Sequence, residues 1–141
     1  MDRLTHRLEL ARAALATLDE LAHKPNRSKV ERDAAIQRFE YSFEAVWKAA
    51  QLYLREVEGL DVGSPKTAAR TSFEVGVLDD EEARRALVMA DDRNLSVHTY
   101  NEGLAEEIAG RVGGHATLLR LWVERMCGRG GPSEASGGRA G

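Results

Sequence analysis

Residues 28–59 of this 141-residue chain read SKVERDAAIQRFEYSFEAVWKAAQLYLREVEG and form its longest stretch with helical periodicity. Ser28-Lys29-Val30-Glu31 is a capping box that predicts where the helix begins, and Gly59 predicts where it ends. The stretch holds most of the aromatic residues, so we expect it to form the centre of the core. Glu40 and Glu44 are interpreted as part of its solvated face. The predicted apolar stripe comprises Ile36, Phe39, Phe43, Val46, Trp47, Ala50, Tyr53, Leu54 and Val57.

Four further helices are predicted around this one. The first ends before Pro25, and a short third helix begins at Ser64-Pro65 and runs to about Glu74, with Gly76 as its stop. The acidic run 79–82 opens a fourth helix. The first helix has the stripe Leu4, Leu8, Ala11, Leu15, Leu18 and Ala22, and the last has Leu104, Ile108, Val112, Ala116, Leu119, Val123 and Met126. Together these segments predict an all-α protein, an up-and-down antiparallel bundle of about five helices with a four-helix core.

Two glycines interrupt the last predicted helix. Gly113-Gly114 weakens its middle by about 1 kcal/mol per Gly relative to Ala. We therefore expect a bend or a close helix crossing at this point.

Composition limits the possible functions. The net charge is −3 although 30% of the residues are charged, which is unlike a general nucleic-acid coat protein. Cys127 is the only cysteine, so the chain forms no internal disulfide and no cysteine-based zinc site. No apolar run approaches the length of a membrane span, and we expect a cytoplasmic protein with no membrane contact. We expect one domain, a helical bundle over residues 1–127, followed by a flexible Gly/Ser-rich tail over residues 128–141.

Residues 93–102, RNLSVHTYNE, gather side chains suited to phosphate chemistry. Arg93 offers a planar fork of donors that matches two phosphate oxygens. His98 can take or give a proton, and Tyr100 carries a hydroxyl that can donate a hydrogen bond or be modified. On one uninterrupted helix these three residues, Asn94 and Asn101 fit within an arc of roughly 160°.

A break in this stretch is the alternative, because Thr99-Tyr100-Asn101-Glu102 has the pattern of a capping box. In that case Arg93 ends one helix and His98 lies in the joint before the next. Spacing alone also allows a structural interpretation, in which Arg93 is a surface charge, His98 caps a helix and Tyr100 is a partly buried core residue. Neighbouring Asp91 and Asp92 could hold Arg93 by ion pairing or face outward.

The same stretch resembles the signature of the HEPN superfamily, which is Arg, four residues, His, one residue and Tyr, here Arg93, His98 and Tyr100. The resemblance extends to the subfamily of nucleotidyltransferase substrate-binding proteins. The stretches that carry it are 33–40, 43–48, Ser64-Pro65-Lys66, Arg70, 73–76 and 92–102, which agree in order.

This resemblance implies a homodimer with active sites at the subunit interface. It also implies a toxin that cleaves RNA without a metal or other cofactor. His98 would move a proton at the ribose 2′-hydroxyl or the leaving oxygen, Arg93 would stabilise the charge on the phosphate, and Asn94 would orient one of them. We expect exposed aromatic surface at Trp47 or Trp122 to serve the dimer.

In such pairs the partner is a small nucleotidyltransferase of the MNT type, which acts as antitoxin and can transfer AMP onto the motif tyrosine, here Tyr100. Lys66, Arg70 and Asn101 are then candidates for substrate binding. The alternative implied by the subfamily is a non-catalytic substrate-binding subunit of a two-component nucleotidyltransferase. We place the ribonuclease toxin ahead of this alternative.

Overall fold

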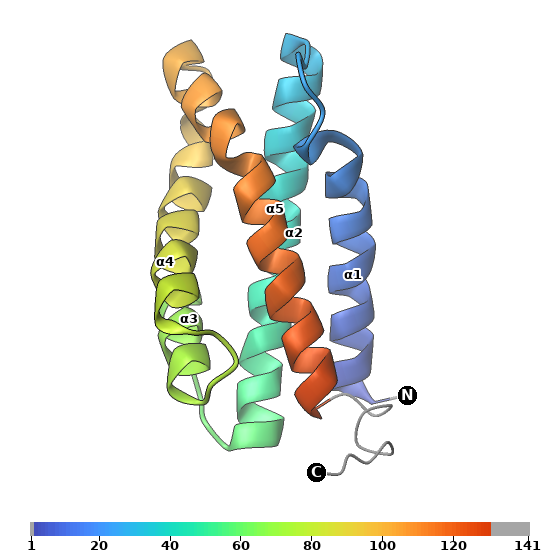
Figure 1. Ribbon diagram of the computed structural model, residues 1–141, viewed down its shortest axis with the longest axis vertical. Coiled ribbons are helices and arrows are strands. Elements are labelled where there is room, and N and C mark those ends of the chain that lie inside the picture. Colours follow the sequence, from blue (N-terminus) through green and yellow to red (C-terminus); the bar gives the residue numbers. More distant parts are fainter. Residues whose placement is uncertain (1, 131–141) are drawn as a thin grey trace.

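The computed structural model describes residues 2–130, and this part of the chain is helical throughout, without a strand (Figure 1). The elements in order are α1 (Arg3–Ala22), α2 (Lys29–Glu58), α3 (Pro65–Glu74), α4 (Asp80–Leu95), a 3₁₀ turn η1 (Ser96–His98) and α5 (Glu102–Gly130). None of these helices has the combination of length and apolar content that a membrane crossing requires. The prediction of an all-helical bundle is confirmed.

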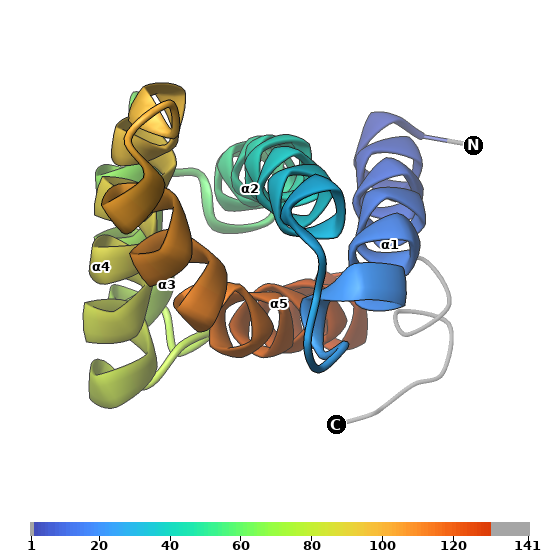
Figure 2. The ribbon, with the colours of Figure 1, turned by 90° about the horizontal axis from the view of Figure 1, so that it is seen from above.

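The four long helices run up and down along the long axis of the molecule, α1 and α4 in one direction and α2 and α5 in the other (Figure 1). Seen from above, α2 and α5 lie at the centre, with α1 on one side and the α3–α4 pair on the other (Figure 2). The short α3 packs against α4 and α2. The joint between α4 and α5 lies at the end of the bundle away from the beginning of α1 (Figure 1).

Local sequence explains where the helices begin and end. The Ser28 hydroxyl accepts a hydrogen bond from the main-chain N of Glu31, and the Glu31 carboxylate accepts one from the main-chain N of Ser28. Gly59 then ends α2 in the left-handed conformation, with φ of 72°, which glycine adopts without steric cost. Ser64 caps α3, with Pro65 at its first position. These predicted boundaries are confirmed.

The core forms along the predicted stripes. All six predicted residues of α1 are buried, and the α2 stripe is buried except at its end, where Val57 is 42% exposed. The expectation of exposed tryptophans is wrong, since Trp47 and Trp122 are both buried. Burial of Trp122 is possible because its indole N–H donates to the Ser72 hydroxyl at 3.1 Å, and Trp47 donates to Glu44 at 3.2 Å.

The end of α5 differs from the predicted boundary. The helix continues through Gly128 to Gly130, a stretch that the sequence assigned to the tail. Arg129 explains the extension, because its guanidinium donates to the main-chain O of Val75 at 2.8 Å and lies 3.8 Å from Glu58. The remainder of the predicted tail, residues 131–141, lies outside the described residues.

The two glycines of α5 have different surroundings. A Cβ at Gly113 would lie 3.2 Å from both the main-chain O of Ala22 and the imidazole Nδ1 of His23, while a Cβ at Gly114 would meet nothing within 4 Å. The predicted close crossing is therefore present at Gly113, where the end of α1 approaches α5.

This difference predicts opposite consequences for two matched substitutions. Gly114→Ala should raise the free energy of unfolding by about 0.5–1 kcal/mol, because Ala lowers the entropy cost of forming the helix. Gly113→Ala should gain less or lose stability, since its methyl group presses on the main chain of α1. Urea unfolding of both variants measures the difference, and equal stabilisation by the two would contradict the close crossing.

Candidate functional site

The joint between α4 and α5 consists of η1 and a short turn. The predicted break in the helix is confirmed, but the cap is not the predicted one. The side-chain O of Asn101 accepts from the main-chain N of Leu104 at 3.1 Å, so Asn101 caps α5 in place of Thr99. Glu102 is therefore the first residue of α5, not the third residue after a Thr99 cap, and its carboxylate accepts a hydrogen bond from the Arg32 guanidinium at 2.7 Å.

Arg32 anchors the beginning of α5 to the beginning of α2. This buried side chain donates to Glu102 and to Glu106, at 2.7 and 2.8 Å, and to Asp33 at 3.0 Å. Glu102 first, and then Glu106 and Asp33, hold the pKa of the guanidinium above its ordinary value. The role of Arg32 was missed from the sequence, because Glu102 and Glu106 come from a distant helix.

His98 and Tyr100 form a pair on the surface of the joint. The Tyr100 hydroxyl lies 3.0 Å from His98 Nδ1, and the two rings meet edge to face with centroids 5.7 Å apart. Tyr100 is 81% exposed, so its interpretation as a partly buried core residue is wrong. A neutral imidazole at this distance can accept the phenolic proton, which makes the exposed oxygen a better nucleophile.

Arg93 lies in the last turn of α4, half-buried, and Asn94 beside it is exposed. Within residues 2–130, the Arg93 Nε is buried without a hydrogen-bond partner. Its neighbouring acids are bound to other cations, Asp91 to Lys66 at 2.6 Å and Asp92 to Arg111 at 2.8 Å. An unsatisfied buried donor is costly, so Arg93 is a candidate to bind an anion.

A contact with α2 supports the joint from below. The Ser96 hydroxyl is buried against the Glu40 carboxylate and lies 2.7 Å from the main-chain O of Arg93. Glu40 is half-buried here, so its interpretation as a solvated residue is wrong. This contact joins η1 to α2, so the spacing of neighbouring residues in the sequence did not predict it.

Asp92 forms a buried cluster with α5. Its carboxylate accepts two bonds from Arg111, both at 2.8 Å, and one from His115 at 2.7 Å. Burial would raise the pKa of Asp92, but the hydrogen bonds from Arg111 and His115 together outweigh it and hold that pKa below its ordinary value. Burial lowers the pKa of His115 and outweighs the hydrogen bond to Asp92, which would raise that pKa. The His115 ring stacks on Phe39, with ring centroids 5.1 Å apart. His115 is thus a structural residue of the core.

The remaining predicted site residues are dispersed around the joint. Lys66 and Arg70 lie on α3, Lys66 in its ion pair with Asp91 and Arg70 exposed. Asn101 uses its oxygen for the cap, which leaves its NH₂ group as a donor. The structure thus brings His98 and Tyr100 into contact. Arg93 lies at the same joint, where its main-chain O accepts a hydrogen bond from Ser96.

The protein is thus an all-helical bundle whose last two long helices are connected by a largely exposed, polar joint. The chain belongs to the family described as nucleotidyltransferase substrate binding protein like, whose model matches residues 6–127. The subfamily resemblance is therefore confirmed, and this family is related to HEPN. The chain is also similar to a protein from Thermus thermophilus of known crystal structure, at 59% identity and a TM-score of 0.81, over 82% of this chain and 98% of that one. No curated protein matches the chain.

The Asp92 cluster predicts a large stability effect for one of two neighbouring acids. Asp92→Asn should lower the free energy of unfolding by about 2–4 kcal/mol, because it breaks a buried pair with Arg111 and His115. Asp91→Asn, which removes an exposed ion pair, should cost about 1 kcal/mol or less.

The pH dependence of this difference gives a check. The folded pKa of Asp92 lies below its ordinary value of 3.8, so its stabilisation is present above pH 3.8 and is lost as the pH falls through the folded pKa. Urea unfolding across the acid range should show the gap between wild type and Asp92→Asn closing in that window. A gap that stays constant would exclude an ionised Asp92.

Proposed function

We propose that this chain is the substrate-binding subunit of a two-component nucleotidyltransferase, and that Tyr100 accepts AMP from ATP bound by the partner enzyme. Family membership supports the nucleotidyltransferase partner. The observation that carries the acceptor role is the 81% exposed Tyr100, whose hydroxyl is hydrogen-bonded to His98 at 3.0 Å. A phenol that is both accessible and next to a base is suited to attack a phosphate.

The transfer step follows from that pair. The Tyr100 oxygen attacks the α-phosphorus of ATP while its proton passes to His98 Nδ1. The bond from the α-phosphorus to the bridging oxygen breaks, and pyrophosphate leaves. His98 acts as general base, and the partner enzyme supplies the bound nucleotide.

Cations near the joint suit the phosphate groups involved. Arg93 has an unsatisfied buried Nε in the part of the chain that the structure describes, and Arg70 is exposed on α3. Lys66 must leave its ion pair with Asp91 before it binds a phosphate, which costs about 1 kcal/mol or less for an exposed pair. Asn101 contributes its free NH₂ group. These four residues form the proposed substrate-binding set.

The acceptor role is tested by mass spectrometry of the intact chain after incubation with its nucleotidyltransferase and ATP. Wild type should gain the mass of one or more AMP groups, and Tyr100→Phe should gain none. Tyr41→Phe is the matched control, because Tyr41 is also a partly exposed tyrosine, 43% accessible on α2. His98→Gln should slow the transfer by about 10²-fold or more, as expected on loss of a general base. Unchanged labelling of Tyr100→Phe would reject the proposal.

A second candidate is the HEPN-type endoribonuclease toxin. It is favoured by the presence, at one joint, of an exposed His98 and of Arg93, whose buried Nε has no hydrogen-bond partner among residues 2–130. His98 would take the proton of a ribose 2′-hydroxyl, Arg93 would stabilise the charge on the phosphate, and Asn94 would orient one of them. The 2′-oxygen would attack phosphorus, the 5′-oxygen would leave, and a 2′,3′-cyclic phosphate would form.

A homodimer fits this second candidate, because one histidine per chain does not easily serve as both base and acid. AMP on Tyr100 would then inhibit the nuclease, since it adds bulk and negative charge beside His98. The partner nucleotidyltransferase would in this case act as an antitoxin of the MNT type.

Cleavage of RNA by the isolated chain tests the nuclease. His98→Ala should lower the rate by about 10²–10⁴-fold, the usual contribution of a general acid or base. His6→Ala is the control, because His6 is exposed on α1, away from the joint. If His98→Ala cleaves RNA as fast as wild type, the nuclease assignment is wrong, and the acceptor role of Tyr100 remains open to its own test.

A further inference from the structure

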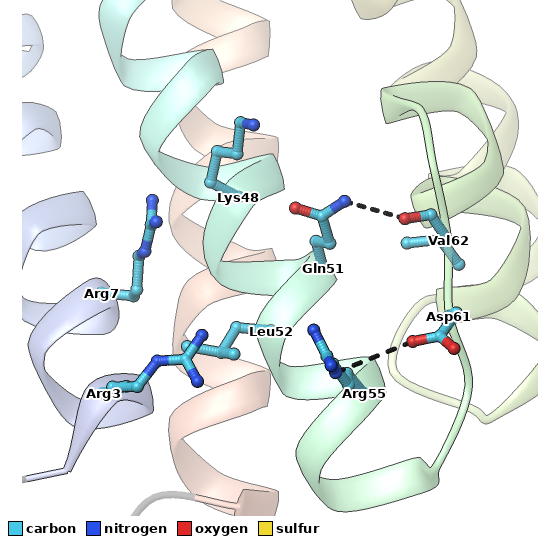
Figure 3. A pocket seen from close by; sticks show the side chains of 8 residues that line it. All are labelled: Arg3, Arg7, Lys48, Gln51, Leu52, Arg55, Asp61 and Val62. Atoms are coloured by element: carbon cyan, nitrogen blue, oxygen red, sulfur yellow. Dashed lines mark hydrogen bonds and ion pairs between the residues drawn. The ribbon is translucent and has the colours of Figure 1, made fainter.

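A second polar site lies between α1 and α2, towards the end of the bundle away from the α4–α5 joint (Figures 1 and 3). It is a pocket of about 190 Å³. Four cationic side chains line it, Arg3 and Arg7 from α1 and Lys48 and Arg55 from α2.

Helical spacing explains why these cations converge. Arg3 and Arg7 are one turn apart, and Lys48 and Arg55 are two turns apart, so each pair lies on one face of its helix. Because α1 and α2 run antiparallel, the beginning of α1 lies beside the later part of α2 (Figure 1). Positive charge from two distant parts of the sequence is thereby brought to one concave surface.

Carboxylates compensate this charge only in part. Arg55 lies 3.9 Å from Asp61, and Arg3 lies 3.6 Å from Glu56. Arg7 and Lys48 form no ion pair within residues 2–130, and the Lys48 ammonium lies instead 4.8 Å over the Trp47 ring. A net positive concave site in a chain of charge −3 concentrates anions locally.

The pocket has a defined wall on the side opposite α1. The Gln51 amide N donates to the main-chain O of Val62 at 2.8 Å, which holds the loop after α2 against that helix. The same bond leaves the Gln51 oxygen on the side of Lys48 (Figure 3). Leu52 of the lining is buried beneath the polar groups. The site is thus an open depression bordered by α1, α2 and the loop.

We propose that this pocket binds the phosphate chain of a small polyphosphate, such as tripolyphosphate or a nucleoside triphosphate. Arginine forks bind phosphate oxygens in pairs, and a lysine adds a compact point charge. The three walls favour a compact anion over an extended nucleic-acid strand. The proposal does not depend on the role of Tyr100, because the joint between α4 and α5 that holds this residue lies at the other end of the bundle (Figure 1).

Calorimetric titration of the full chain at low ionic strength tests the proposal. Three probes separate the phosphate chain from the nucleoside: sodium tripolyphosphate, ATP and adenosine. Tripolyphosphate and ATP should both bind, adenosine should not, and the affinity should fall as salt is added. Absence of tripolyphosphate binding would overturn the proposal, even if ATP binds.

Matched double variants locate the site. Arg7→Gln combined with Lys48→Gln should weaken tripolyphosphate binding by about tenfold or more, because each cation makes charge-assisted hydrogen bonds to phosphate. Lys29→Gln combined with Arg84→Gln removes the same two charges from exposed positions elsewhere and should stay within about twofold, as expected for screened charges outside the pocket. Thermal unfolding of each variant confirms that the fold is retained.

The remaining outcomes are also decisive. If the two double variants weaken tripolyphosphate binding equally, the binding depends on the overall charge of the protein and not on the pocket, and the proposal is overturned. Binding of single-stranded RNA that depends on Arg7 and Lys48, without tripolyphosphate binding, would assign the surface to nucleic acid and overturn it as well. Tyr100→Phe should bind tripolyphosphate as wild type does, so failure of the acceptor role leaves this result unaffected.

Discussion

A single buried carboxylate constrains how the second half of the molecule packs. Asp92 is removed from water, so its charge must be matched, and Arg111 and His115 of α5 supply three hydrogen bonds. These three bonds fix the orientation of α4 about its own axis relative to α5. Arg93 is the next residue, so its direction is set by the same requirement. The geometry of the joint therefore depends on an interaction that lies beneath it.

The helices and their ends could be predicted because they follow from neighbours in the sequence. The Ser28 cap, the Ser64-Pro65 start and the Gly59 stop each depend on residues within one turn. The cap of α5 could not be predicted in this way. α5 begins at Glu102, so Asn101 is the cap, and the Glu102 carboxylate binds Arg32 of α2. The local sequence pattern at residues 99–102 does not show the contact between Glu102 and Arg32, because Arg32 lies on a distant helix.

The candidate site shows the same division. His98 and Tyr100 were grouped by sequence, and they do meet, because two positions along a turn bring their rings together. The support that Ser96 receives from Glu40 crosses between helices and was not predictable. The basic pocket was not predicted. The spacing of Arg3 and Arg7 is visible in the sequence, but only the antiparallel packing of α1 against α2 brings these two arginines close to the cations of α2.

The contact between His98 and Tyr100 is made within η1 and the turn that follows it. Any displacement of this segment would therefore move both rings together. Arg93 instead belongs to α4, whose position is tied to α5 through the neighbouring Asp92. A small rotation of the segment relative to α4 would change the distance between the Arg93 guanidinium and the two rings, while the contact between His98 and Tyr100 would be kept. The direction of Arg93 and the contact between His98 and Tyr100 therefore depend on different parts of the fold.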